Sequence, residues 1–332
     1  MPIITSKRLG TPVKIYFEVH GKEGGQAIIF HHGNGNASRD WGPLGYLEKL
    51  ASQYKLVLID MLGYGNSEKA TDPKAYDPQL RAMDTIAVLD ELGLKDNIIF
   101  FGGSMGGQLG FTLALNPKYH HRFSMFIITC ATPYGTAELS PQFVKLLTPA
   151  KQRGICYFVE ELEKAMGKPF HPFIKTTFLL NNVDAMIASN TIAWPDYSKS
   201  LHLIKTPFLL IVGEKDPIYN QVCACHKSLS NSTLEIIAGK DHVDTYWDSS
   251  VSVPLIIKYL NSLTSIDAKS DEKSRTKKKE TTNVKKIDAP SAEEVSASLN
   301  NAIRGKKASP NHTKNHNIDP LNPSLKLNCN VL

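Results

Sequence analysis

One short segment constrains this chain more than any other, because four glycines surround Ser104 directly after an apolar run. The segment reads GGSMGG over residues 102–107 and follows the apolar residues 98–101. Glycine inside a regular element costs roughly 0.5–1 kcal/mol relative to alanine, so this cluster indicates a backbone path that a Cβ would block. Residues 105–115 have the small and apolar content of a helix packed on a sheet. We therefore predict a buried strand, a sharp turn at Ser104 and a helix.

The turn matches the pattern G-x-S-x-G, in which a strained backbone presents a serine hydroxyl above a sheet. Gly102 and Gly106 would then lie where strand and helix approach too closely for a side chain. A glycine-rich phosphate loop is the alternative, but the segment fits neither G-x-x-x-x-G-K-[ST] nor G-x-G-x-x-G. The pattern thus favours Ser104 as a nucleophile.

A serine hydroxyl is a weak nucleophile unless a base takes its proton and an acid orients that base. In folds with this turn, the acid and then the histidine follow the serine, each after a later strand. Asp216 follows the apolar run 208–212, and His242 follows the run 233–238. We predict Asp216 as the acid, with Glu214 as the less favoured choice, and His242 as the base.

The negative charge that develops on a substrate oxygen needs preorganised N–H donors. We predict the backbone N–H of Met105 as one donor. The other is assigned to a loop rich in glycine and asparagine, where Asn34 is preferred over Gly33. His31 and His32 precede it, but adjacent residues of an extended segment point to opposite faces, so we expect no metal site there.

Taken together, these motifs resemble the α/β-hydrolase family over roughly residues 13–263. The resemblance is carried, in this order, by HHGNGNAS (31–38), DMLGYGNS (60–67), GGSMGG (102–107), VGEKD (212–216) and GKDH (239–242). In the family, the turn that Asp60 opens has an architectural role. Relatives that open epoxides or remove halides carry an aspartate where this chain has Ser104. The resemblance therefore implies a serine hydrolase of the esterase type.

The order of strands and helices predicts an α/β fold. We expect residues 1–263 to form a mostly parallel, eight-stranded-type sheet with helices on both faces. Residues 131–194 resemble the helical cap that covers the active site in the family, with helical patterns over 141–147, 155–166, 172–180 and 183–192. The apolar residues of this insertion indicate a greasy acyl group in the substrate, or they form the core of the cap itself.

Residues 264–332 differ in composition from the rest of the chain. They contain no Phe, Tyr or Trp, and 13 Lys and Arg against 8 Asp and Glu, which gives +5 of the total net charge of +6. We predict a disordered tail, because so polar a segment cannot bury enough surface to fold. Its basic runs fit an anionic membrane or simple solvation, and we expect no nucleic-acid binding without aromatic residues for stacking. Residues 291–305 have the pattern of a short capped helix.

The chain ends in CNVL, which resembles a C-a-a-X prenylation box with Cys329 as the acceptor. Asn330 departs from the usual aliphatic residue at its position. The basic tail supplies the second signal that stable membrane anchoring requires. We hypothesise a prenylated protein at the cytosolic face of a membrane, which is a host membrane if the protein is a bacterial effector.

Cysteine use favours a cytoplasmic, reducing compartment, because five cysteines allow no complete set of disulfide pairs. The first ten residues also lack the apolar run of a signal peptide. Cys223-Ala224-Cys225-His226 is interpreted as part of a helix, since a second pair of metal ligands is missing. We expect an enzyme without a metal or other cofactor.

The predicted chemistry is acyl transfer from a small-molecule or lipid acyl substrate, an ester or thioester, to water. Ser104 attacks the carbonyl carbon, His242 moves the proton, and Asp216 orients His242. Two alternatives remain open, an acyltransferase with an alcohol acceptor and a catalytically silent binding module. The sequence predicts neither the natural substrate nor the oligomeric state.

Overall fold

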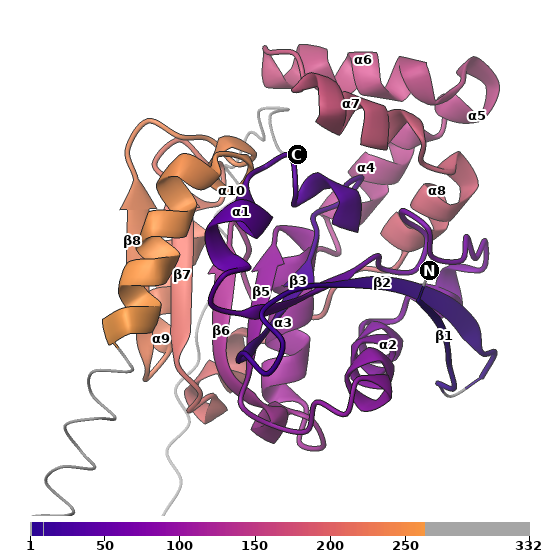
Figure 1. Cartoon of the computed structure of the whole chain (residues 1–332). Helices are drawn as coiled ribbons and strands as arrows, with labels where there is room; N and C mark the ends of the chain where they lie inside the picture. Colours follow the sequence, from indigo (N-terminus) through magenta and orange to yellow (C-terminus); the bar gives the residue numbers. More distant parts are fainter. Residues whose placement is uncertain (1, 9, 263–332) are drawn as a thin grey trace, which may run out of the picture. The chain divides into compact units, whose positions relative to one another are not determined.

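The structure is a computed structural model, and it describes residues 2–8 and 10–262. Within this part of the chain, eight strands form one sheet in the order β1-β2-β4-β3-β5-β6-β7-β8 (Figure 1). The pairs β1–β2 and β2–β4 are antiparallel, and the remaining pairs are parallel. The strands are β1 (Ile3–Ser6), β2 (Val13–Gly21), β3 (Ala27–His31), β4 (Lys55–Ile59), β5 (Ile98–Gly103), β6 (Phe123–Thr129), β7 (Phe208–Gly213) and β8 (Ser232–Ile237). The predicted α/β class with a mostly parallel sheet is confirmed.

Helices alternate with these strands. Outside the long connection between β6 and β7 they are α1 (Tyr46–Leu50), α2 (Pro78–Glu91), α3 (Met105–Leu115), α9 (Tyr219–Ser228) and α10 (Asp244–Trp247), and residues 249–262 are also helical. Short 3₁₀ helices are η1 (Ser38–Asp40), η2 (Pro73–Tyr76), η3 (His120–Arg122) and η4 (Ser198–Leu203). Among the described residues, no helix has both the length and the apolar character needed to cross a membrane.

Adjacent phenylalanines of β5 show how both faces of the sheet are covered, because neighbouring strand residues point to opposite faces. The Phe101 ring packs edge-on and tilted against Trp41 and Tyr46, the latter in α1. Phe100 instead faces α3, which passes so closely that a Cβ on Gly110 would lie 2.8 Å from its ring. Because helices cover both faces of the sheet at β5, every residue of this strand is buried, which explains its continuous apolar sequence.

The connection from β6 to β7 is helical, as the pattern of residues 131–194 predicts. It contains α4 (Leu139–Leu147), α5 (Ala150–Arg153), α6 (Ile155–Met166), α7 (Pro172–Leu179) and α8 (Val183–Thr191). Figure 1 shows these helices gathered in the upper right of the view. We refer to α4–α8 and their connections as the cap. The predicted tail over 264–332, its short helix over 291–305 and the prenylation box at Cys329 lie outside the described residues.

Candidate active site

Ser104 lies at the turn between β5 and α3, in a conformation that residues with a side chain rarely adopt. Its φ is 50° and its ψ is −115°. The Ser104 N–H donates to the carbonyl of Thr129 at 2.9 Å, and the Ser104 carbonyl accepts from the N–H of Gln108 at 3.1 Å. Strain of this kind costs about 1–3 kcal/mol and persists only where the surroundings fix it. The sharp turn that the glycines predict is present.

The glycines around Ser104 allow three backbone segments to approach one another. A Cβ on Gly102 would lie 2.5 Å from the backbone of Gly106. A Cβ on Gly106 would in turn lie 2.3 Å from the carbonyl oxygen of His31 in β3. Both distances are far below van der Waals contact, so these two positions require glycine for the reason that the sequence suggested.

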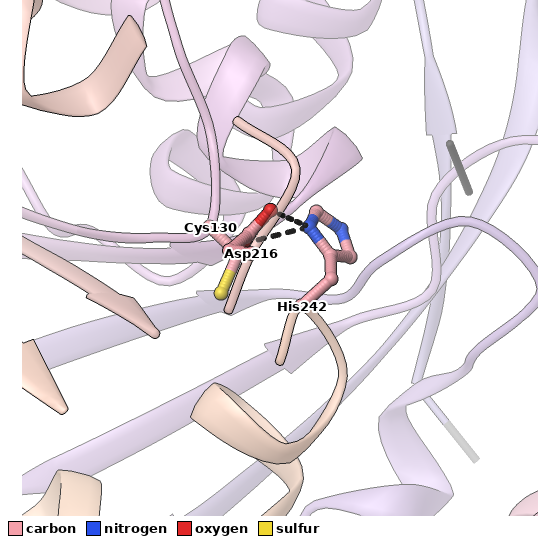
Figure 2. A group of neighbouring side chains, drawn as sticks. All are labelled: Cys130, Asp216 and His242. Atoms are coloured by element: carbon pink, nitrogen blue, oxygen red, sulfur yellow. Dashed lines mark hydrogen bonds and ion pairs between the residues drawn. The ribbon is translucent and has the colours of Figure 1, made fainter. Parts of the chain in front are cut away.

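His242 bridges Ser104 and Asp216. Its Nε2 lies 3.0 Å from Ser104 Oγ. Its Nδ1 lies 3.0 Å from Oδ2 and 3.2 Å from Oδ1 of the Asp216 carboxylate, and Figure 2 shows the contacts between His242 and Asp216. The Asp216 side chain is fully buried, and that of His242 is 16% exposed. A proton on Nδ1, donated to Asp216, leaves Nε2 free to accept the hydroxyl proton of Ser104.

The carboxyl ends of parallel strands bring these three side chains together. Ser104 follows β5, Asp216 follows β7, and His242 follows β8. Asp216 Oδ1 also accepts the N–H of Ile218 at 3.0 Å, which fixes the carboxylate. Asp241 precedes His242, and its Oδ1 accepts from the first backbone N–H of α10 at 3.0 Å. The predicted acid and base therefore lie in loops with defined geometry.

A cysteine that the sequence reasoning missed lies beside the acid. Cys130 directly follows β6, is 1% exposed and has a positive φ of 51°. Its Sγ lies within 4.8 Å of ligand atoms of Asp216 and His242 (Figure 2). The sequence signal is its position directly after the apolar run 123–129, whereas the position of β6 between β5 and β7 is visible only in the sheet.

The three side chains of this cluster are of types that bind metals, but His242 and Asp216 are already engaged with each other. Burial, and next the negative charge of Asp216, raise the pKa of the Cys130 thiol well above its ordinary value. In the arrangement shown, the thiol is therefore neutral and lies beside the carboxylate. The cluster therefore fits a buried thiol that contacts the carboxylate.

Asn34 and Met105, the predicted oxyanion donors, have backbone N–H groups that are free for a ligand. Met105 is the first residue of α3, where helical N–H groups lack an intrahelical acceptor. Within residues 2–8 and 10–262, neither N–H donates a hydrogen bond to another group. The side chain of Asn34, in contrast, binds Tyr64 and Asn190 at 2.7 Å and 2.8 Å. The loop is thus held through its side chain while its N–H stays unpaired.

His31 and His32 support the loop that leads to Asn34. The N–H of Met61 donates to His32 Nε2 at 3.0 Å, and His32 Nδ1 donates to the carbonyl of Gly33 at 2.8 Å. His31 Nε2 lies 3.1 Å from Thr85 Oγ1. Burial lowers the pKa of His31 to about 3 and also lowers the pKa of His32. Both are neutral packing residues at neutral pH.

A groove of about 530 Å³ lies between the α6–α7 connection and the region around α10. Its apolar wall includes Phe170, Phe173 and Trp247, and Phe170 and Trp247 stack edge to face at 5.4 Å. Ser104 does not line this groove. Other apolar cap residues, Phe178 and Met186, are buried at 5% and 0% exposure. The cap thus uses part of its apolar surface for packing and part for this groove.

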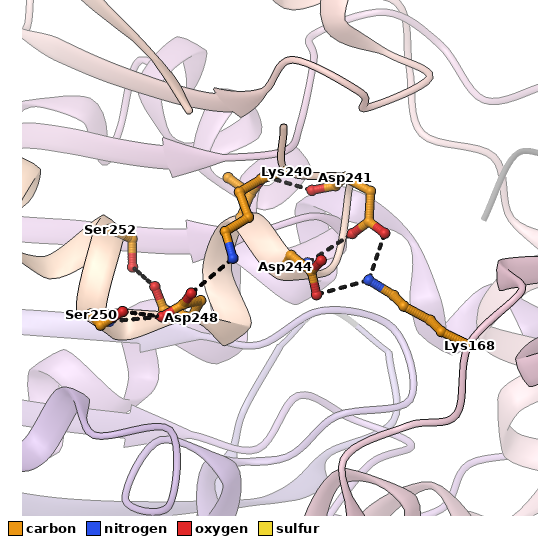
Figure 3. A network of polar contacts seen from close by, with 8 residues as sticks. Lys168, Lys240, Asp241, Asp244, Asp248, Ser250 and Ser252 are labelled. Carbon is orange, nitrogen blue, oxygen red and sulfur yellow. Dashed lines mark hydrogen bonds and ion pairs between the residues drawn. The ribbon is translucent and has the colours of Figure 1, made fainter. Parts of the chain in front are cut away.

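A network of charges crosses from the cap to the loop of His242 (Figure 3). Lys168, in the α6–α7 connection, pairs with Asp241 at 2.5 Å and with Asp244 at 2.8 Å. Lys240 pairs with Asp248 at 2.9 Å. The first set of contacts joins two segments that are far apart in the sequence, and it involves the residue immediately before His242.

The sequence of this chain was also compared with models of known protein families, and the result agrees with the fold described above. Residues 26–153 match the family model described as alpha/beta hydrolase fold. Over these residues the chain is similar to the α/β-hydrolase fold family. The match includes the turn at Ser104, whereas the segments that carry Asp216 and His242 come later in the chain.

The proteins to which this chain is similar have diverse activities. A protein of Bacillus subtilis (strain 168), provisionally named 2-succinyl-6-hydroxy-2,4-cyclohexadiene-1-carboxylate synthase, is 25% identical over 67% of this chain and 85% of its own. A non-heme chloroperoxidase of Burkholderia pyrrocinia is 24% identical over 73% of this chain and 93% of its own. The solved structure of a thermophilic esterase from Thermogutta terrifontis superposes with a TM-score of 0.66 at 21% identity, over 79% of this chain and 98% of that one. These similarities support a hydrolase in general and leave the scissile bond open.

Proposed function

We propose that this protein is a serine hydrolase that cleaves an ester or thioester through an acyl-enzyme. The observation that carries the proposal is the chain of hydrogen bonds from Ser104 through His242 to Asp216, with 3.0 Å on each side of the imidazole. A hydroxyl within hydrogen-bonding distance of a neutral imidazole can transfer its proton as it attacks. A buried carboxylate on Nδ1 then stabilises the imidazolium that forms.

The reaction has two halves in this proposal. Ser104 Oγ attacks the carbonyl carbon while His242 Nε2 takes its proton, and the N–H groups of Asn34 and Met105 bind the oxyanion. His242 then protonates the leaving alcohol or thiol, which departs. Water repeats the attack on the acyl-enzyme, with His242 again as the base, and releases the acid. The substrate is a small-molecule or lipid acyl compound.

The first experiment compares the wild type with Ser104→Ala. Both are treated with a fluorophosphonate probe and with p-nitrophenyl esters from acetyl to dodecanoyl, together with an acyl thioester. We expect labelling and turnover by the wild type only. Labelling of Ser104→Ala would contradict the assignment of the nucleophile. A folded wild type without labelling would favour a silent binding module, and acyl transfer to added alcohols in preference to water would indicate an acyltransferase.

We also propose that the C-terminal segment tethers the enzyme to the cytosolic face of a membrane. The proposal rests on the sequence alone: Cys329 in a C-a-a-X-like box and the basic residues upstream of it. Mass spectrometry of the C-terminal peptide from eukaryotic cells should find a prenyl group that Cys329→Ser lacks, and only the wild type should sediment with membranes. An unmodified C-terminal peptide would contradict it.

A further inference from the structure

Two asparagine side chains join the cap to the loop of the predicted oxyanion donor. Asn34 Nδ2 donates to Asn190 Oδ1 at 2.8 Å, and Asn190 Nδ2 donates back to Asn34 Oδ1 at 3.4 Å. Asn190 lies in α8 and is itself fixed, because its Nδ2 also donates to the carbonyl of Met186 at 2.8 Å. The loop thus forms a reciprocal amide pair with a helix that comes 156 residues later.

The same Asn34 side chain is the end of a longer chain of hydrogen bonds. The Tyr64 hydroxyl donates to Asn34 Oδ1 at 2.7 Å and lies 2.9 Å from Ser189 Oγ. The Tyr64 hydroxyl is the donor in both contacts. Ser189 Oγ accepts in turn from Arg81 Nη2 at 2.8 Å. Ser189 Oγ therefore accepts from both Arg81 and Tyr64, and one hydrogen-bond network connects Arg81, through Ser189 and Tyr64, to Asn34.

Arg81 is the charged donor in this hydrogen-bond network. Its guanidinium is buried, donates from Nε to the carbonyl of Tyr76 at 3.0 Å, and lies 5.0 Å from the centre of the Tyr76 ring and 5.4 Å from that of Trp194. A permanently charged donor makes stronger hydrogen bonds than a neutral one. Ser189 and Asn190 are consecutive residues of α8, so one turn of the cap helix contacts both the arginine and the loop.

Helix α7 holds the next residue of the loop independently. Asn181 Nδ2, just after α7, donates to the carbonyl of Gly35 at 2.7 Å. The Phe178 ring lies so close that a Cβ on Gly35 would be 2.3 Å from it. Gly33 and Gly35 flank Asn34, and such a loop has little stiffness of its own. Its geometry therefore depends on the cap.

We propose that cap helix α8 sets the position of the Asn34 backbone N–H through the Asn34–Asn190 amide pair, with Asn190 as a positioning residue. The inference rests on the proposed function, in which that N–H binds the oxyanion. A displacement of about 1 Å in a catalytic group can cost about 100-fold in rate, and loss of one oxyanion donor costs about 10²–10³-fold in kcat. The cap is then part of the machinery that stabilises the transition state, as well as a cover.

The test compares Asn190→Ala with Thr191→Ala in the full chain. Thr191 is the exposed neighbour in α8, and its hydroxyl bonds only within its own helix in the described structure, to the carbonyl of Ile187 at 2.8 Å. We expect Asn190→Ala to lower kcat by about 10- to 100-fold with KM changed less than about threefold, because the oxyanion forms only in the transition state. Thr191→Ala should keep the kcat of the wild type.

Asn34→Ala removes the same pair from the loop side and keeps the backbone N–H. It should reproduce the loss in kcat, and the double variant should be no slower than the slower single one, because both act on one interaction. Hydrogen exchange of residues 33–37 should accelerate in Asn190→Ala and not in Thr191→Ala. This measurement needs no substrate and distinguishes positioning from general loss of stability.

The outcomes separate this inference from the proposed function. A wild type that neither reacts with a fluorophosphonate nor hydrolyses any ester contradicts both, since no oxyanion then forms. An active wild type with equal kcat in Asn190→Ala, with unchanged exchange in the loop, or with losses that multiply in the double variant contradicts the positioning role alone.

Discussion

Lys168 of the cap pairs at 2.5 Å with Asp241, the residue immediately before His242. It also pairs with Asp244 of α10 at 2.8 Å. On the opposite side of the site, Asn190 of the cap binds Asn34 at 2.8 Å. The cap therefore contacts both the loop of the proposed base and the loop of the proposed oxyanion donor, and its removal would release two parts of the site at once.

Replacing Lys168 with methionine should weaken catalysis moderately. The charged side chains of Lys168 and Asp241 are 31% and 35% exposed, so solvent screens the pair and its worth is about 0.5–1 kcal/mol. We expect kcat/KM to fall roughly two- to fivefold, with less difference from the wild type at high salt. Lys164→Met is the control, because Lys164 pairs only with Glu161 of its own helix among the described residues. Equal effects of the two substitutions on kcat/KM would refute the idea that Lys168 helps to hold the loop of His242 in place.

Replacing Ser104 with glycine should abolish activity and stabilise the fold. At φ 50° and ψ −115° a residue with a Cβ is strained by about 1–3 kcal/mol, and glycine relieves this strain at a smaller entropic cost. Relative to Ser104→Ala, we expect a gain of about 1 kcal/mol, or roughly 2–4 °C in Tm. Thermal unfolding of the two variants checks this. A glycine variant that melts below the alanine variant would show that the turn is not strained.

Replacing Gly106 with alanine should disrupt the crossing of β3 and α3. The new Cβ would lie 2.3 Å from the backbone carbonyl oxygen of His31, which cannot rotate away as a side chain could. We expect a loss of about 3 kcal/mol or more in the free energy of unfolding. Gly42→Ala is the matched control, because nothing lies within 4 Å of its Cβ position, and it should change stability by less than about 0.5 kcal/mol. Similar denaturation midpoints for the two variants would contradict the packing argument.

Mild acid should destabilise the fold through His31. Burial lowers the pKa of His31 from 6.5 to about 3, so between these values the unfolded chain binds a proton that the folded chain does not. The stability that this group contributes is present above pH 6.5 and is lost as the pH falls towards 3. Between pH 6.5 and 5 the loss is about 1.5–2 kcal/mol.

The measurement is urea unfolding of the wild type and His31→Gln at several pH values. Gln is neutral throughout and can still bind Thr85, so its stability should fall less between pH 6.5 and 5. Burial raises the pKa of Asp84 to about 6, which acts in the opposite direction, but Asp84 is present in both proteins. Parallel curves for the two proteins would show that His31 does not titrate as the structure implies.

The turn at Ser104 was accessible from sequence because its constraint is local. Glycines at 102 and 106 and an apolar run before them suffice to predict a strand, a tight turn and a helix, and the same reasoning placed Asp216 and His242 after strands. β1 was not predicted, because its four residues are too few to show a clear alternation of apolar and polar residues. In the sheet, β1 is an edge strand that pairs with β2. Cys130 escaped because nothing near it in the sequence shows that β6 lies beside β7.

Local patterns in the amino-acid sequence predict the fold class, the strained turn and the order of the residues proposed for catalysis, since each depends on the conformation of a few neighbouring residues. The contacts that hold those residues in place are visible only in the folded protein. The pair of Asn34 with Asn190, the ion pair of Lys168 with Asp241 and the contact of Cys130 with Asp216 join segments 73 to 156 residues apart, or neighbouring strands of the sheet. Such contacts arise from the packing of the cap and the register of the sheet, and no local pattern encodes either.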